Sequence, residues 1–135
     1  MEEQWYQCNP VAFPEGRYEL IELTQTFDGL KLVFDDGKSS ITVEYKDELL
    51  AFRSCDESDR WRTISDVLAT HEKGFLPYKL MFKVENSDFK KWFVRECFGI
   101  REMDEFEHHC FVTPNDIVDV LAVHEPEIQI GETKA

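Results

Sequence analysis

The chain has 135 residues, of which 28 are Asp or Glu and 15 are Lys or Arg, so its formal net charge is −13. This charge opposes binding to nucleic acid or to an anionic membrane, and it speeds encounter with a basic partner. Because 42% of the residues are hydrophobic and 13% are aromatic, the chain is no disordered acidic segment, and we expect one folded domain over residues 1–135.

The first half of the chain predicts an extended arm followed by an antiparallel meander. Prolines and a glycine interrupt residues 1–16, which we expect to be an N-terminal arm. Apolar and polar residues then alternate as in half-buried strands, and Asp28-Gly29 is a strong hairpin signal. The predicted strands of the meander cover residues 18–27, 30–34, 41–45 and 50–52.

Two segments with helical spacing of apolar residues predict two principal helices, near residues 58–71 and 87–98. Ser58 is suited to cap the first helix, and Asn86 or Ser87 the second, while Gly99 is a stop signal. The faces expected to point inward hold Trp61, Ile64, Val67 and Leu68 in the first helix, and Phe89, Trp92, Phe93 and Cys97 in the second.

The remaining elements are strands. Residues 78–84 alternate, and residues 109–112 favour a further strand. The segment 113–116 fits both a helix start and a hairpin turn, but residues 117–121 after it are rich in β-branched side chains, so we favour a turn and a strand that ends by Pro126. Residues 131–135 are expected to be a frayed tail. These elements predict an α+β fold with a mostly antiparallel sheet packed with two helices.

Clusters of reactive side chains favour structural interpretations over catalysis or metal binding. His108, His109 and Cys110 offer zinc ligands, but a zinc site needs about four ligands, and neighbours on a strand point to opposite faces. Cys97 lies on an apolar helix face, where an inert thiol is expected. Asp35-Asp36-Gly37 lacks the ligand pattern of a calcium loop and is better explained as a turn. We expect no catalytic residue, no metal and no cofactor.

The sequence also predicts a compartment. Its first residues lack the basic and apolar regions of a secretory signal, and no apolar run approaches the roughly 20 residues of a membrane span. The four cysteines are dispersed and form no C-x-x-C pair. We therefore expect a cytoplasmic protein with reduced thiols.

Two acidic clusters are the candidate binding surfaces. An acidic loop with an embedded aromatic residue fits a protein interface, in which charges steer the partner toward an aromatic anchor. The alternative interpretation is a solvated loop. The candidate residues are Glu102, Asp104, Glu105, Phe106 and Glu107 in one cluster, and Asp56, Glu57 and Asp59 in the other.

Several short segments together are similar to a known class of proteins. They are Phe52-Arg53-Ser54 with Asp56-Glu57 and Arg60, residues 82–87, Trp92-Phe93, and residues 113–121 followed by Glu125-Pro126. Over residues 17–130 the chain resembles the immunity proteins encoded beside polymorphic and contact-dependent bacterial toxins. The resemblance implies a protein that binds a cognate toxin domain in the cytoplasm and blocks its active site or its substrate path.

Many such toxins are nucleases with basic clefts, so an acidic inhibitor would place carboxylates where phosphates lie. The alternative function is a small cytoplasmic enzyme or ligand-binding domain with a pocket between the sheet and the helices. The resemblance itself assigns no contact residue.

Overall fold

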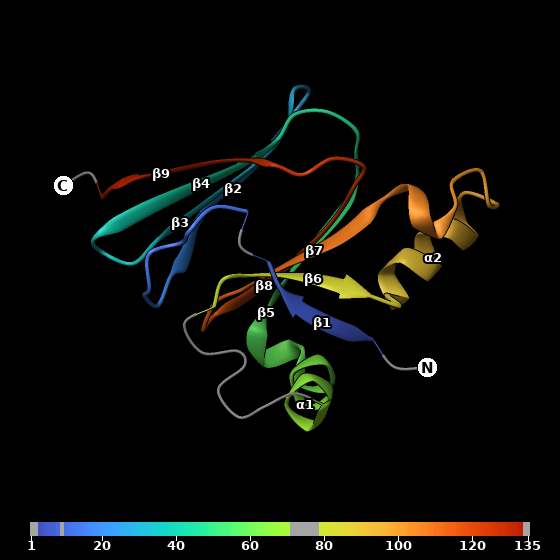
Figure 1. Ribbon diagram of the computed structural model, residues 1–135, viewed down its shortest axis with the longest axis horizontal. Helices are drawn as coiled ribbons and strands as arrows, with labels where there is room; N and C mark the ends of the chain where they lie inside the picture. Colours follow the sequence, from blue (N-terminus) through green and yellow to red (C-terminus); the bar gives the residue numbers. More distant parts are fainter. Residues whose placement is uncertain (1–2, 9, 71–78, 134–135) are drawn as a thin grey trace.

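A computed structural model describes residues 3–8, 10–70 and 79–133, which form nine strands in two antiparallel sheets and two α-helices (Figure 1). The five-stranded sheet has the order β1 (Gln4–Gln7), β6 (Met81–Glu85), β7 (Glu107–Val112), β8 (Asp116–Ala122) and β5 (Leu49–Asp56). The four-stranded sheet has the order β2 (Glu19–Thr26), β3 (Gly29–Asp35), β4 (Ser39–Tyr45) and β9 (Glu127–Glu132). The helices are α1 (Trp61–Thr70) and α2 (Asp88–Glu96), with 3₁₀ turns η1 (Glu57–Asp59) and η2 (Met103–Glu105). The predicted α+β class is confirmed.

The five-stranded sheet forms the middle layer of the molecule. One of its faces packs against the four-stranded sheet, where Phe34 of β3 stacks on Phe111 of β7 with 5.5 Å between the ring centroids. Its other face is covered by the helices, with Val67 of α1 in one apolar cluster and Phe89 of α2 beside Leu121 in another. Figure 1 shows both helices on the side of this sheet away from β2, β3 and β4.

The three predicted turns are confirmed, and side chains explain two of them. The Thr113 hydroxyl accepts a hydrogen bond from the amide of Asp116 at 2.9 Å, so the segment turns between β7 and β8 and starts no helix. At the β3–β4 turn, the amides of Lys38 and Ser39 donate to the Asp36 carboxylate. Both turns therefore form from short polar side chains that satisfy nearby backbone amides.

The predicted meander holds for its first three strands and fails at the fourth. β5 leaves the four-stranded sheet and pairs with β8, from Leu49 opposite Ala122 to Asp56 opposite Asp116. Glu48, just before β5, has a left-handed backbone with φ 50°, where the chain changes sheets. Alternation of apolar residues predicts a strand and its buried face. It does not predict which strand pairs with it, because a strand in either sheet buries one face against the other sheet.

Both chain ends hold a strand that the sequence did not predict. Within the expected arm, β1 pairs with β6, and Trp5 is buried opposite Val84 while Tyr6 is half exposed. Within the C-terminal segment, β9 pairs with β4, and Ile128 packs against the core. The hydroxyl of Thr133 also donates to the Asp35 carboxylate at 2.9 Å. The expected frayed tail is therefore wrong for residues 131–133, and residues 134–135 lie outside the described part.

The helices have the expected places but narrower buried faces. Of the two predicted caps of α2, Ser87 is the one used, and its hydroxyl accepts from the Lys90 amide. Ser58, in contrast, does not cap α1 as predicted. It lies in η1, and α1 begins three residues later at Trp61. Each helix rests on a sheet and buries one stripe, so side chains at the margin of the apolar face stay in solvent. The residues expected inside that are more than two-fifths exposed are Trp61, Leu68 and Trp92.

One predicted strand is irregular, and two predicted element limits cannot be compared with the structure. A β-bulge between Leu20 and Glu22 interrupts the alternation predicted for residues 18–27, and Ile21 is exposed. The helix limit expected at residue 71 and the strand start expected at residue 78 lie outside the described residues.

Candidate functional site

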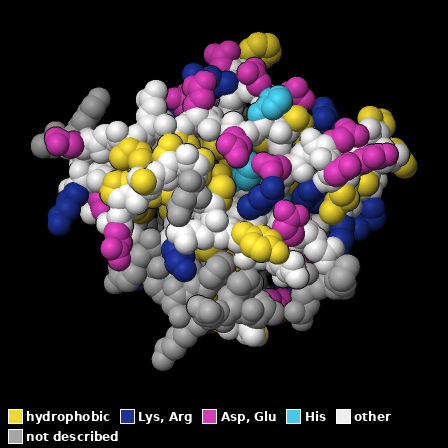
Figure 2. Space-filling view, viewed as in Figure 1, with side chains coloured by type: hydrophobic (Ala, Val, Ile, Leu, Met, Phe, Trp, Pro, Cys, Tyr) yellow, Lys and Arg dark blue, Asp and Glu magenta, His cyan; other side chains and the backbone are white. Residues whose placement is uncertain are grey.

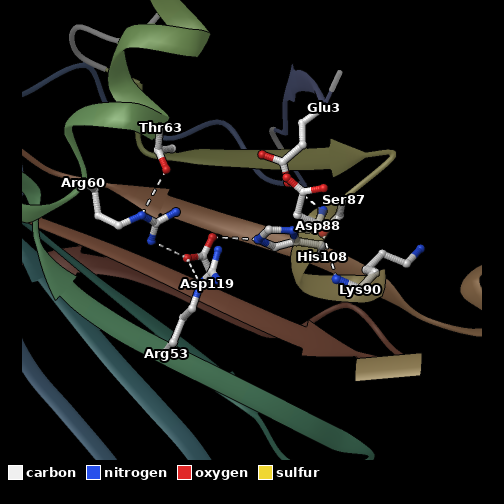
Figure 3. Close-up of polar contacts among 9 residues, drawn as sticks. All are labelled: Glu3, Arg53, Arg60, Thr63, Ser87, Asp88, Lys90, His108 and Asp119. Carbon is white, nitrogen blue, oxygen red and sulfur yellow. Dashed lines mark hydrogen bonds and ion pairs between the residues drawn. The ribbon is translucent and has the colours of Figure 1, made fainter. Parts of the chain in front are cut away.

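A buried ionic cluster lies between the two helices, at the centre of the covered face of the five-stranded sheet (Figure 3). The carboxylate of Asp119 is fully buried and accepts from Arg53 Nε at 2.7 Å, Arg60 Nη1 at 2.8 Å and His108 Nε2 at 2.6 Å. Burial alone would raise the pKa of Asp119. The hydrogen bond from His108 and the charges of the three partners outweigh it and hold this pKa well below its ordinary value.

The cluster continues from His108 to Ser87, at the start of α2. Because the Asp119 carboxylate only accepts, His108 Nε2 donates to it, and His108 Nδ1 lies 2.6 Å from the Ser87 hydroxyl. The Ser87 hydroxyl also accepts from the Lys90 amide at 3.0 Å. These residue types are those of a nucleophilic triad, but Ser87 is fully buried and out of a substrate's reach. The arrangement fastens α2 to β7 and β8.

His109 belongs to a separate network on the opposite face of β7. Its Nδ1 lies 2.8 Å from the Tyr45 hydroxyl, and its Nε2 lies 3.1 Å from Glu107. Glu107 also pairs with Lys83 at 2.6 Å. The hydrogen bond with His109, with the help of Lys83, lowers the pKa of Glu107 from 4.5 to about 2. The two adjacent histidines point to opposite faces as predicted, and each is buried within a hydrogen-bond network.

The structure also shows the state of the cysteines and the arrangement of side chains that could bind a metal ion. All four cysteines are free thiols, and burial raises the pKa of Cys110 well above its ordinary value, which favours the unreactive protonated form. In the described part of the chain, no three His, Cys, Asp or Glu side chains are placed to share a metal ion. Among the same residues, no helix is both long enough and apolar enough to cross a membrane.

The two predicted acidic clusters lie at opposite ends of the five-stranded sheet. Glu107 is opposite Ala122 at one end of β8, whereas Asp56 is opposite Asp116 at its other end. The six residue steps between these ends correspond to about 20 Å at the rise of a strand. The structure therefore does not combine the clusters into one surface.

Within the first cluster, the predicted aromatic anchor is wrong. Phe106 is 2% exposed and packs edge-on against Phe93, with the Lys90 ammonium 5.0 Å from its ring centroid. Glu102 and Glu105 cap η2 reciprocally and stay exposed, as does Asp104. Phe106 turns inward because β7 begins directly after it and its covered face lies under α2.

The second cluster is smaller and partly structural. Asp56 caps η1, with its carboxylate accepting from the amide and the hydroxyl of Ser58. Glu57 is partly buried, and Asp59 is exposed. One free carboxylate at a short turn is a weak binding surface.

Tertiary structure enlarges the first cluster into a broader acidic surface. The loops before β5 and after β8 reach the same end of the sheet as Glu107, because Leu49 and Glu107 both pair with Ala122. Figure 2 shows acidic side chains concentrated over this part of the molecule, at the upper right. We call this surface the acidic end; it comprises Asp47, Glu48, Glu85, Glu102, Asp104, Glu105, Glu107 and Glu125.

Three hollows mark the surface of the described residues, and one of them, of about 590 Å³, lies between the β2–β3 turn and the loop after β4. The outer face of the four-stranded sheet forms an open depression of about 1020 Å³, lined largely by polar side chains such as Lys31, Thr42 and Gln129. A pocket of about 330 Å³ lies between α1 and the β7–β8 turn. Two of its polar groups are already engaged, because the Tyr18 hydroxyl donates to the Pro14 carbonyl and Thr113 supports the turn.

Sequence reasoning missed Asp119, although a signal was present. A lone carboxylate in the apolar run of residues 117–121 is costly to bury without cationic partners, so it calls for Arg or His nearby. Its partners come from three separate segments, which the sequence alone does not connect.

No protein-family model, curated protein or solved structure matches this chain.

Proposed function

We propose that this protein is an immunity protein, which binds a basic toxin domain in the cytoplasm through the acidic end. The observation that carries the proposal is the concentration of carboxylates there. Within the described residues, Asp47, Glu102, Asp104 and Glu125 take part in no ion pair within 4.0 Å. Their mutual repulsion is relieved when a basic surface approaches them.

The inner part of the acidic end is fixed in place by ion pairs and burial. Lys83 lies 2.6 Å from Glu107 and 3.8 Å from Glu85, which neutralises part of the charge closest to the sheet. The outer carboxylates stay available to a partner. Such an arrangement gives a rigid base with a free negative rim, which favours fast encounter with Lys and Arg side chains.

A basic nuclease is the toxin class that best fits this surface. Nuclease clefts hold Lys and Arg for the phosphates of their substrate. Carboxylates on a rigid surface can occupy the same positions and exclude the nucleic acid. The resemblance to immunity proteins supports the choice of a toxin as the basic partner.

A ligand-binding or enzymatic function is the second candidate, favoured by the pocket of about 330 Å³ between α1 and the β7–β8 turn. Its volume lies at the lower end of the range for small-molecule sites, roughly 300–1,000 Å³. The prior engagement of Tyr18 and Thr113 weighs against it, because a ligand would find fewer free polar groups there.

Co-expression tests the proposal. The C-terminal domain of the toxin encoded beside this gene is expressed in a bacterial host with and without this protein. We expect cells to survive only when both are present, and a one-to-one complex to elute from gel filtration at low salt. Death of the cells despite this protein, with no complex, contradicts the proposal, as does a genome with no toxin gene next to this one.

A further inference from the structure

The loop after α2 exposes two large apolar side chains. Phe98 is 95% exposed and Ile100 is 82% exposed, with Gly99 between them. Figure 1 shows the connection from α2 toward β7 at the right-hand extreme of the molecule, away from both sheets. Apolar side chains this exposed, adjacent and projecting are typical of a contact surface for a partner.

The backbone holds Phe98 outward in an uncommon conformation. Its φ is 54°, in the left-handed region that residues other than glycine rarely adopt. Hydrogen bonds fix the loop there: the Phe98 amide donates to the Arg95 carbonyl at 3.2 Å, and the Gly99 amide to the Val94 carbonyl at 2.9 Å. The loop is thus a defined cap of α2, and an aromatic side chain stands where glycine would be less strained.

Exposed carboxylates flank this apolar pair on both sides along the chain, beside the exposed Arg95 and the partly buried Arg101. Glu96 precedes it, and Glu102 and Asp104 follow it. Packing of Phe93 in α2 against Phe106, with 5.5 Å between ring centroids, holds the loop beside the acidic end. An aromatic residue with a charged rim is the usual composition of a binding hot spot.

We propose that Phe98 and Ile100 are the apolar anchor of the acidic end and enter an apolar pocket on the toxin domain. Glu96, Glu102 and Asp104 then pair with Lys and Arg side chains around that pocket. This inference rests on the proposed function and adds an apolar contact, which the charges alone do not provide. Charges speed the encounter, whereas a buried apolar contact slows dissociation. The anchor expected at Phe106 is thereby replaced by Phe98.

Alanine variants test the anchor against a matched control. Phe27 at the β2–β3 turn is fully exposed, so Phe27→Ala removes the same side chain from a different place. Binding of each variant to the neighbouring toxin's C-terminal domain is measured by surface plasmon resonance. Phe98→Ala should weaken binding roughly thirtyfold or more, mainly through faster dissociation. Ile100→Ala should act in the same direction, and Phe27→Ala should change affinity by no more than about twofold.

A glycine variant separates binding from folding. Phe98→Gly should raise the denaturant midpoint of the free protein, because glycine adopts the left-handed conformation without strain. The same variant should weaken binding as much as Phe98→Ala. A wild-type affinity for Phe98→Ala, or a larger loss for Phe27→Ala, overturns the anchor and leaves the proposed function intact. Absence of any complex with the wild-type protein overturns both.

Discussion

At the scale of single residues, Asp119 and Glu107 show how this acidic chain uses its carboxylates. Asp119 is fully buried under three hydrogen-bonding partners, and Glu107 joins a histidine and a lysine at the sheet end. In both cases the ionised form is the one that the fold stabilises, because each pKa lies below its ordinary value. Stability therefore depends on a few inner carboxylates, whereas Asp47, Glu102, Asp104 and Glu125 stay available for binding.

Loss of the Asp119 carboxylate should be strongly destabilising. Asp119→Ala leaves Arg53 and Arg60 without their shared acceptor, and such a break in a buried ionic cluster costs about 3–5 kcal/mol. Urea denaturation followed by tryptophan fluorescence measures the change in unfolding free energy. Asp59→Ala, at an exposed carboxylate, is the control and should leave it nearly unchanged. A loss for Asp119→Ala as small as that of the control would show that the cluster contributes little.

Glu107 predicts part of the acid sensitivity. Since its folded pKa is about 2 against an ordinary 4.5, its stabilising contribution is complete above pH 4.5 and disappears as pH falls toward 2. Glu107→Gln should therefore be less stable than the wild type at neutral pH, and the two should converge near pH 2. Denaturant midpoints across this range provide the measurement, and parallel curves for the two proteins would contradict the assignment.

At the scale of elements, α2 joins the stability of the fold to its exposed surface. Its inner side packs Phe89 under the Arg53 guanidinium, 4.2 Å above the ring centroid, and edge-on against His108. Its C-terminal end presents the Phe98 loop. A helix fastened at its start by Ser87 can present a rigid loop at its end, because the hydrogen bonds along it transmit the position of the first turn.

Two aromatic residues of α2 should differ in their contribution to stability. Phe89 is 5% exposed, so Phe89→Ala should cost about 3–5 kcal/mol, the usual cost of emptying a large aromatic site. Trp92 is 44% exposed, so Trp92→Ala should cost clearly less, although its ring stacks on Phe89. Thermal or denaturant unfolding of both variants gives the comparison. Equal losses would mean that the Trp92 ring contributes as much as the buried ring.

At the scale of the whole molecule, the net charge of −13 is distributed unevenly over the surface. Much of it lies at the acidic end, while the opposite end of the five-stranded sheet holds the smaller Asp56 cluster. Partner binding that depends on this asymmetry is screened by salt, since the Debye length falls from about 10 Å at 0.1 M to about 3 Å at 1 M. Association with the toxin domain should slow accordingly.

Two charge-reversal variants locate the binding face. One carries Asp47→Lys, Asp104→Lys and Glu125→Lys at the acidic end, and the other carries Glu19→Lys, Asp59→Lys and Glu132→Lys elsewhere. All six side chains are exposed, and both variants change the net charge equally. Stopped-flow association at low salt should be much slower for the first variant than for the second. Equal slowing would mean that only net charge matters, and slower association of the second would move the interface away from the acidic end.

The sequence by itself determined the types of the elements and most of their places. Alternation set β3 and β4, the β-branched residues of the segment 117–121 set β8, and short polar side chains set the turns at Asp36 and Thr113. The cap at Ser87 and the opposite orientation of His108 and His109 also followed from local rules. These features depend on residues within a few positions of one another, so a local pattern contains the information for them.

Only the tertiary structure decided which strands pair, which aromatic residues are exposed and where charge accumulates. β5 pairs with β8, 60 or more residues away, and the partners of Asp119 come from β5, β7 and the start of α1. Phe106 and Phe98 each lie within two residues of a glutamate in the sequence, yet one is buried and the other exposed. The difference arises because burial depends on what packs above a residue, and that neighbour comes from a distant part of the chain.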